Sequence, residues 1–147
     1  MDKLSKFAEN LNDLMFDAKI TAEQLSAAIG AGLTTVNRWK RDASKIRLSH
    51  LLKLADFFAC SLDFLTGRSD TELDYTPLQC PPFFEQLRLV MEKYQVTRYR
   101  IVKDTKIYDS YFTNWKNGAD PHILTLIDLA NYFNCSVDSL VGRDKLP

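Results

Sequence analysis

The feature that most constrains the fold of this 147-residue chain is an internal repeat. The segment LADFFACSLDFLTGR at residues 54–68 matches LANYFNCSVDSLVGR at residues 129–143 in nine of fifteen positions. An internal match of this length indicates duplication, so the chain is expected to contain two similar domains. Their expected limits and the linker between them are residues 1–69, 79–147 and 70–78.

Composition and charge argue against a membrane-spanning or secreted chain and give no overall sign of nucleic-acid binding. The 19 basic and 19 acidic residues balance, so no overall basic charge marks the chain as a nucleic-acid-binding protein. No apolar run approaches the roughly 20 residues that a membrane span needs. The N-terminal MDKLSKFAEN lacks the apolar core of a signal peptide. We therefore expect a cytoplasmic chain without a membrane partner.

The segment TAEQLSAAIGAGLTTVNRWKR, residues 21–41, is expected to form two short helices joined by a tight turn. Thr21 can open the first helix with a capping box. Gly30 stands where that helix must end, because glycine adopts positive φ without a steric cost. Val36 and Trp39 have helical spacing in the second helix and leave polar residues for its outer face. This is the pattern of a helix-turn-helix, whose second helix reads the major groove of DNA.

Three further helices are expected in each half. First helices are predicted at about residues 4–17 and 82–94, and a fourth helix at about residues 48–59 with its counterpart from Ile123. A short fifth helix should begin at Ser61 and at Ser136, since serine is a favoured N-cap residue.

Each half, with five helices of which the second and third form the helix-turn-helix, resembles the Cro/C1-type (XRE) repressor family. The resemblance covers about residues 4–67 and 82–142. It is carried by the helix-turn-helix spacing, by the aromatic that closes helix three (Trp39, Trp115) and by the L-A-x-x-F-x-C-S-x-D-x-L tail. It implies an all-α fold of two tandem five-helix lambda-repressor-like domains. It also implies a sequence-specific DNA-binding transcriptional regulator, in the simplest case a phage-type repressor.

The resemblance also implies which residues meet double-stranded DNA. In the first half these are Thr34, Asn37, Arg38, Lys40, Arg41, Lys45 and Arg47, and in the second Arg98, Tyr108, Ser110, Thr113, Asn114 and Lys116. Arginine suits guanine and asparagine suits adenine, whereas Asp109 on the second reading helix would suit only a cytosine amino group. The cations of the first half lie where this fold makes phosphate contacts. Either group of cations could also be only a solvated surface, but the position of the first group favours a contact with phosphate.

The two halves depart from the family pattern at the turn. The turn glycine is Gly30 in the first half but Lys106 in the second, where a left-handed backbone would cost about 1 kcal/mol. The small residue that lets helix two approach helix three is Ser26 in the first half and the bulkier Val102 in the second. The second half is therefore the more divergent at this point.

The sequence gives little support for an enzymatic function. No Gly-rich phosphate loop, metal-ligand pair or nucleophile–base constellation occurs in the sequence, so we expect no catalysis, no cofactor and no metal site. Three cysteines, Cys60, Cys80 and Cys135, do not make a disulfide framework and are interpreted as structural.

The main alternative is a protein-interaction or dimerisation module, antitoxin-like or partner-binding, in which one or both helix-turn-helix units no longer read DNA. Cations on the reading helices would favour DNA, and exposed apolar or aromatic residues there would favour a partner protein. The sequence also leaves a homodimer open.

Overall fold

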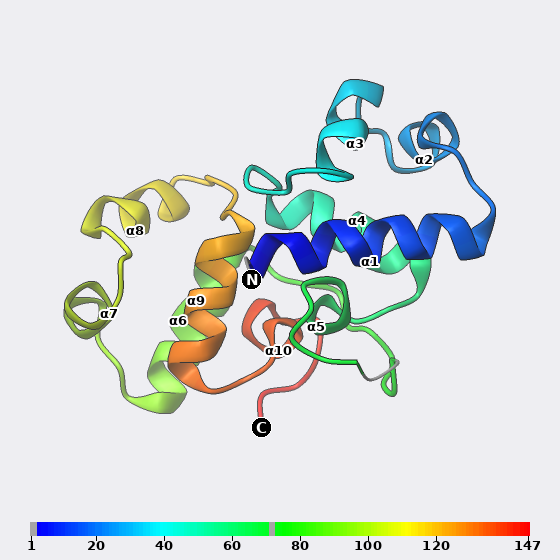
Figure 1. The fold of residues 1–147 in the computed structure, drawn as a ribbon. Coiled ribbons are helices and arrows are strands. Elements are labelled where there is room, and N and C mark those ends of the chain that lie inside the picture. The colour runs from blue at the N-terminus through cyan, green and yellow to red at the C-terminus, as the bar shows by residue number, and fades with distance from the viewer. Residues whose placement is uncertain (1–2, 71–72) are drawn as a thin grey trace. The chain divides into compact units, whose positions relative to one another are not determined.

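The computed structural model describes residues 3–70 and 73–147, with side chains from residue 6 onwards (Figure 1). Within these residues the secondary structure consists of ten helices and no strand, in agreement with the all-α class predicted from the sequence. The chain divides into two compact units, Met1–Asp74 and Tyr75–Pro147. Residues 71 and 72 of the expected linker lie outside the described residues.

The second unit begins at Tyr75, four residues before the expected limit at residue 79. The backbone N–H of Leu78 donates to the carbonyl of Arg143 at 2.8 Å, which joins the end of the expected linker to the second unit. Sequence composition alone could not show this bond, because it joins residues that are far apart in the chain.

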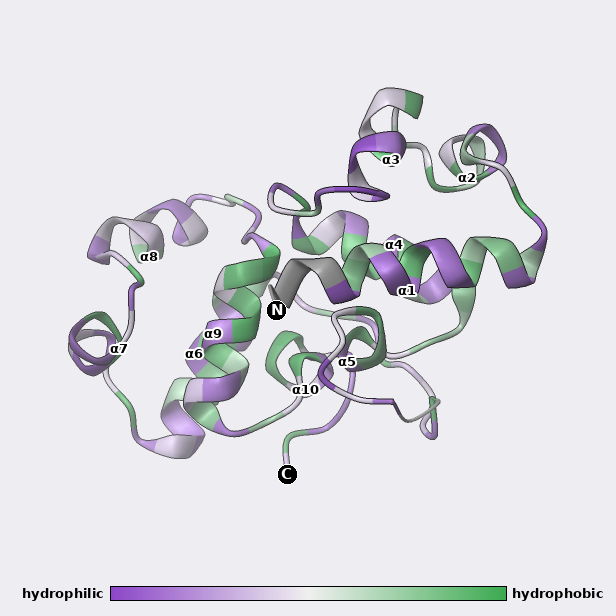
Figure 2. Cartoon of the chain, in the orientation of Figure 1, coloured by the Kyte–Doolittle hydropathy of each residue, from purple (hydrophilic) through white to green (hydrophobic). Residues whose placement is uncertain are grey.

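In the first unit, side chains from all five helices form one core. The helices are α1 (Lys3–Ala18), α2 (Ala22–Ile29), α3 (Leu33–Trp39), α4 (Leu48–Phe58) and α5 (Leu62–Leu65). Helix α2 packs against α3 and α4, and α5 packs against α1 and α4. Each helix contributes a side chain with no exposed surface: Leu11, Leu25, Val36, Leu51 and Leu65. Hydrophobic and hydrophilic residues accordingly occur together on these helices, as amphipathic helices require (Figure 2).

The second unit also contains five helices among its described residues. They are α6 (Phe83–Tyr94), α7 (Arg98–Asp104), α8 (Asp109–Lys116), α9 (Ile123–Phe133) and α10 (Val137–Val141). Helix α8 packs against α6 and α7, and α10 packs against α6 and α9. The core includes one deeply buried side chain from each helix: Leu87, Ile101, Phe112, Leu126 and Leu140.

A buried side-chain amide ties the first helix of each unit to the last. Nδ2 of Asn10 donates to the carbonyl of Phe64 at 2.9 Å, and Nε2 of Gln86 donates to the carbonyl of Ser139 at 3.3 Å. Both amides are almost fully buried. The carbonyls of a short helix have few partners within the helix. Each amide therefore adds a second donor to a carbonyl that also accepts from the N–H of Gly67 or Gly142.

The repeated tail carries the same ion pair in both units, at different depth. Nη1 of Arg68 lies 2.8 Å from Oδ1 of Asp63, and these side chains are 22% and 18% exposed. Nη1 of Arg143 lies 2.9 Å from Oδ1 of Asp138, and both side chains are only 2% exposed. Ser61 and Ser136 cap the helices that carry the two acids, as predicted.

Candidate nucleic-acid interface

The turn of the first helix-turn-helix has the predicted structure. The Thr21 hydroxyl accepts from the N–H of Gln24 at 3.2 Å, and Oε1 of Gln24 accepts from the N–H of Thr21 at 2.8 Å, which completes the capping box. Gly30 ends α2 in the left-handed region, with φ 73° and ψ 26°. The hydroxyl of Ser26 donates to the carbonyl of Ala31 and ties α2 to the segment that enters α3.

The turn of the second helix-turn-helix is built differently. Helix α7 ends before Thr105, whose backbone is extended, with φ −128° and ψ −179°. The Thr105 hydroxyl donates to the carbonyl of Ile101 at 2.6 Å and accepts from the N–H of Ile107 at 3.1 Å. Lys106 does not have a positive φ. The left-handed backbone considered for this position is therefore not adopted, and its cost does not arise.

Helix α3 has a buried face and an exposed face. Val36 and Trp39 are 0% and 1% exposed, and the Trp39 ring lies 5.0 Å from that of His50, so both residues belong to the inner face of the helix, as their spacing predicted. Thr34 and Asn37 are exposed on the same helix. Nδ2 of Asn12 on α1 donates to the carbonyl of Lys40 at 3.0 Å. This bond holds the C-terminal end of α3 in place.

Most cations expected to contact DNA from the first unit have no acidic partner. Among the described residues, no carboxylate lies within 4.0 Å of the charged groups of Arg38, Lys40, Arg41 or Lys45. Nε of Arg38 is buried without a hydrogen-bond partner in this part of the structure. Arg47 is exposed and directly precedes α4. The charges of Arg38, Lys40, Arg41 and Lys45 are thus available to an external anion.

One acid, Asp42, lies among these cations. Its Oδ1 accepts from the backbone N–H of Ser44 at 2.9 Å. This bond, the Ser44 hydroxyl and the charges of Arg38 and Lys45 lower the pKa of Asp42. Asp42 is therefore ionised at neutral pH and offsets part of the positive potential beyond the end of α3.

In the second unit α8 has a comparable division into faces. Phe112 and Trp115 are 2% and 6% exposed, and Trp115 packs edge-on against Phe83 with the ring centroids 5.2 Å apart. The exposed residues among those expected to contact DNA are Tyr108, Ser110, Thr113, Asn114 and Lys116. Tyr108, which is 68% exposed, lies edge-on to Tyr111 with the ring centroids 5.6 Å apart.

Arg98 differs from Arg38, Lys40, Arg41 and Lys45 because it is paired with a carboxylate within the protein. Its Nε donates to Oδ1 of Asp109 at 2.7 Å. Its Nη2 donates to the carbonyl of Asp109 at 2.7 Å and to the hydroxyl of Thr113 at 3.2 Å. Two of the residues expected to meet DNA, Arg98 and Thr113, are thus joined to each other. The sequence contained a signal for this contact, namely an arginine that opens α7 and an acid that opens α8.

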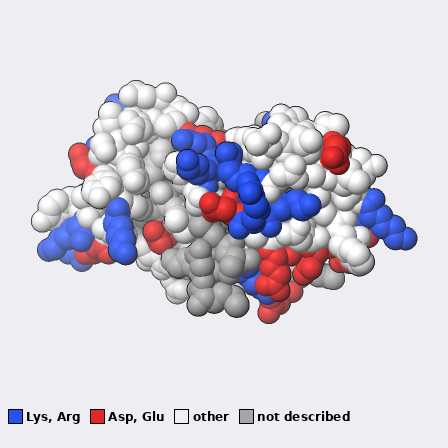
Figure 3. Space-filling model, turned by 45° about the horizontal axis from the view of Figure 1, so that its top comes forward, with Lys and Arg blue, Asp and Glu red and all other residues white. Residues whose placement is uncertain are grey.

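Charge is distributed over the surface in local groups. Figure 3 shows Lys and Arg side chains in several separate groups on the face in view, with Asp and Glu side chains beside them. Any contact with phosphate must therefore come from local clusters of cations. The described residues contain no His/Cys/Asp/Glu cluster suited to a metal ion, and none of their helices is long and apolar enough to cross a membrane.

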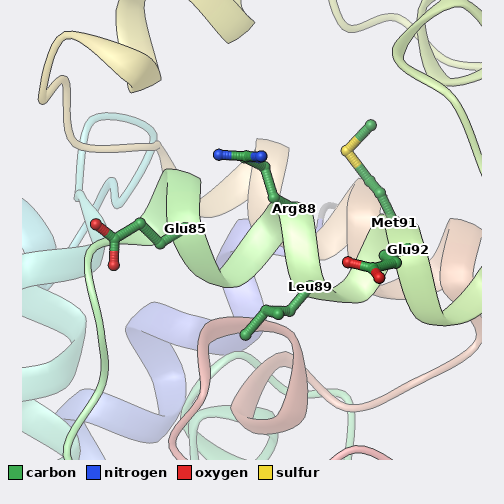
Figure 4. Close-up of a pocket in the computed structure, with 5 residues that line it drawn as sticks. All are labelled: Glu85, Arg88, Leu89, Met91 and Glu92. Atoms are coloured by element: carbon green, nitrogen blue, oxygen red, sulfur yellow. The ribbon is translucent and has the colours of Figure 1, made fainter.

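A depression on α6 offers no comparable chemistry. It is lined by Glu85, Arg88, Leu89, Met91 and Glu92. Figure 4 shows Arg88 and Met91 projecting from one side of α6 and Leu89 from the other, so these side chains do not converge on a common point. Helices α3 and α8 therefore carry the better candidate site.

Comparison with known proteins agrees with this assignment for the first unit. Residues 10–66 match the family model of the Cro/C1-type HTH DNA-binding domain. No curated protein and no solved structure matched the chain. The family match begins within α1 and extends through α2, α3, α4 and α5. Over residues 10–66 the first unit is thus similar to a Cro/C1-type HTH DNA-binding domain.

Proposed function

We propose that the chain is a sequence-specific DNA-binding transcriptional regulator that inserts α3 into the major groove and acts as a repressor. The observation that carries the proposal is the two-sided character of α3. Val36 and Trp39 are buried, whereas Thr34 and Asn37 are exposed beside cations without an acidic partner. The family match of this segment supports the same function.

The side chains on α3 and directly after it suit both parts of DNA recognition. Arg38 can donate two hydrogen bonds to O6 and N7 of guanine, and Asn37 can bond both N6 and N7 of adenine. Lys40, Arg41 and Lys45 supply charges for phosphate contacts, which orient the protein without reading sequence. A chain bound at a promoter excludes other proteins from it, and repression needs no further activity. No catalytic step is involved.

The second unit has two candidate functions. In the first, its α8 also reads DNA through Ser110, Asn114 and neighbouring residues. In the second, the unit is a protein-interaction or dimerisation module. The specific observation that favours the second candidate is the exposure of two aromatic side chains, Tyr99 on α7 at 69% and Tyr108 at the start of α8 at 68%. Exposed tyrosines are enriched at protein interfaces.

Selection from random double-stranded DNA, followed by sequencing of the bound pool, tests the proposal. We expect one sequence motif to be enriched and its binding to weaken steeply with salt, because phosphate contacts release counterions. A matched control is Lys93→Ala, which removes an exposed cation from α6, outside both helix-turn-helix motifs. A bound pool as random as the input would refute sequence-specific binding. It would leave the protein-interaction module as the remaining candidate.

The size of the bound complex separates the candidates for the second unit. If both units read DNA, one chain should occupy a site made of two unlike halves, since the residues on the two reading helices differ. If the second unit is a dimerisation module, two chains should occupy a palindromic site. Sedimentation of the purified complex together with footprinting gives the stoichiometry and the symmetry of the site.

A further inference from the structure

We infer that Arg98 and Asp109 form a base-reading pair, in which Asp109 accepts a hydrogen bond from the amino group of a cytosine and Arg98 holds that carboxylate in place. The inference rests on the proposed function, in the form in which α8 meets DNA. It assigns Arg98 a positioning role rather than the direct DNA contact expected from the sequence.

The guanidinium of Arg98 is held at several points. It donates to the side chain and to the carbonyl of Asp109, each at 2.7 Å, and to the hydroxyl of Thr113 at 3.2 Å. Residues four apart lie on the same face of a helix, so one planar group spans the first turn of α8. The guanidinium also lies 5.1 Å from the centre of the Phe112 ring, at the distance of a cation–π contact.

Asp109 keeps an acceptor for an external donor. Its side chain is 72% exposed and its Oδ1 accepts from Arg98. Within the described residues, no second partner contacts the carboxylate. An ionised carboxylate is an acceptor only, so it can bind a base solely through an amino group. Because Arg98 already fixes its orientation, little conformational entropy remains to be lost on binding.

Two bases present an amino group in the major groove, and their neighbouring atoms distinguish them. Adenine carries the acceptor N7 beside its amino group, whereas cytosine has no acceptor on its own major-groove edge. A carboxylate placed against adenine therefore faces a like acceptor, and one placed against cytosine does not. The pair is expected to prefer cytosine for this reason.

Arg98 also removes the electrostatic penalty of an acid on a reading helix. Duplex DNA carries about one negative charge per 1.7 Å of its axis, which repels an unpaired carboxylate. The guanidinium 2.7 Å from Oδ1 makes the pair neutral overall. Charge neutrality lets α8 approach the groove while Asp109 keeps its acceptor.

A purely structural clamp between α7 and α8 is the competing explanation. Both side chains are exposed, at 41% and 72%, and exposed ion pairs contribute little to stability. If the pair were only a clamp, substitution of Arg98 or Asp109 would leave the base preference unchanged. A reading pair would change the preference at one base position, so preference is the decisive measurement.

The test is a selection from random DNA with the wild type, Asp109→Asn and Arg98→Ala. The wild-type site should contain one position that strongly prefers cytosine. Asp109→Asn keeps the shape of the side chain but adds a donor, which suits adenine, so the cytosine preference should fall about tenfold and shift towards adenine. Arg98→Ala should lose the same preference and also weaken binding to all sequences, because the acid is then uncompensated. Asn114→Ala, the matched control on α8, should affect a different position.

Two outcomes overturn the inference and are distinguishable. If the wild type selects a site and both variants keep its cytosine preference, the pair is a clamp only, and the proposed function stands. If the wild type selects no site, the proposed function fails and the inference fails with it. The indole N–H resonance of Trp115 in each variant verifies that the second unit is folded. Arg98→Lys, which keeps the charge but not the fork of donors, should recover affinity but not base preference.

Discussion

The turns of the two helix-turn-helix motifs both connect two short helices, but different backbone conformations and hydrogen bonds form them. In the first, Gly30 adopts a left-handed backbone and the Ser26 hydroxyl bonds the carbonyl of Ala31. In the second, α7 stops before Thr105, an extended residue whose hydroxyl makes two bonds within the turn. The comparison teaches that the turn glycine is dispensable when the preceding helix ends early and a hydroxyl bonds the backbone groups of the turn.

Helices α3 and α8 differ in the state of the charges around them. Four cations near α3 have no carboxylate partner among the described residues. Near the start of α8, by contrast, Arg98 is neutralised by Asp109. One helical pattern thus supports an open cationic surface in one unit and an internally paired one in the other. The following variants are chosen in matched pairs to test this contrast.

The largest difference is expected between the two tail ion pairs. Asp138→Ala should destabilise the second unit by about 3–5 kcal/mol, because it removes the carboxylate 2.9 Å from Nη1 of the buried Arg143. Asp63→Ala should cost the first unit about 1–2 kcal/mol, since water can reach the more exposed Arg68. Urea denaturation followed at the indole resonances of Trp39 and Trp115 reports each unit separately. Equal losses in the two units would contradict the difference in burial.

The next effect concerns base reading at equivalent positions of the repeat. Arg38→Ala should weaken binding to the selected site by about 1–3 kcal/mol and relax preference at one base position. Asn114→Ala, its counterpart 76 residues later, should have a smaller effect because asparagine carries no charge to attract DNA. Titration of the selected site and of single-base variants measures both. A larger loss of binding free energy for Asn114→Ala would contradict the expectation that the first unit makes the stronger base contact.

A smaller effect is expected at the two turns. Gly30→Ala should cost about 1–2 kcal/mol through its left-handed backbone alone, since an added Cβ would meet no atom within 4 Å. Lys106→Gly should give no gain and should lose roughly 0.5–1 kcal/mol, because it only adds freedom to the unfolded chain. Thermal or denaturant unfolding of the two variants tests the contrast. Stabilisation by Lys106→Gly would show that this residue is strained after all.

The smallest effect is expected at Lys40 and its counterpart Lys116. Lys40→Ala should reduce the slope of log binding constant against log salt by about 1 and weaken all sequences alike. Lys116→Ala should do the same only if α8 also lies against DNA. Binding titrations over a series of salt concentrations give both slopes. An unchanged slope for Lys40→Ala would remove this residue from the set of phosphate contacts.

Local rules predicted much of the fold and part of the site. The capping box at Thr21, the left-handed Gly30 and the core position of Trp39 follow from the spacing and conformational preferences of a few neighbouring residues. The partners of Arg98 and of Asn10 could not be predicted in this way. They lie 11 and 54 residues away, and the choice among several acids or carbonyls depends on how the helices pack.

The backbone conformation of Lys106 could not be predicted from the sequence either, for a related reason. Whether this residue adopts positive φ depends on where α7 ends. That end lies at Thr105, whose N–H and hydroxyl both donate to the carbonyl of Ile101 and whose hydroxyl also accepts from the N–H of Ile107. Alignment with Gly30 gives the position in the repeat but not the conformation.

The two ends of each unit lie against each other, and this has a consequence for how such a chain can be rearranged. A Cβ on Gly67 would collide with the side chain of Lys6, and a Cβ on Gly142 would lie 2.7 Å from Cδ of Pro81. A unit whose beginning and end meet can be copied in tandem with only a short connecting segment, and without extending its own fold. The same closure makes each unit a natural subject for circular permutation, with new ends opened in a surface loop and the old ones joined by a few residues.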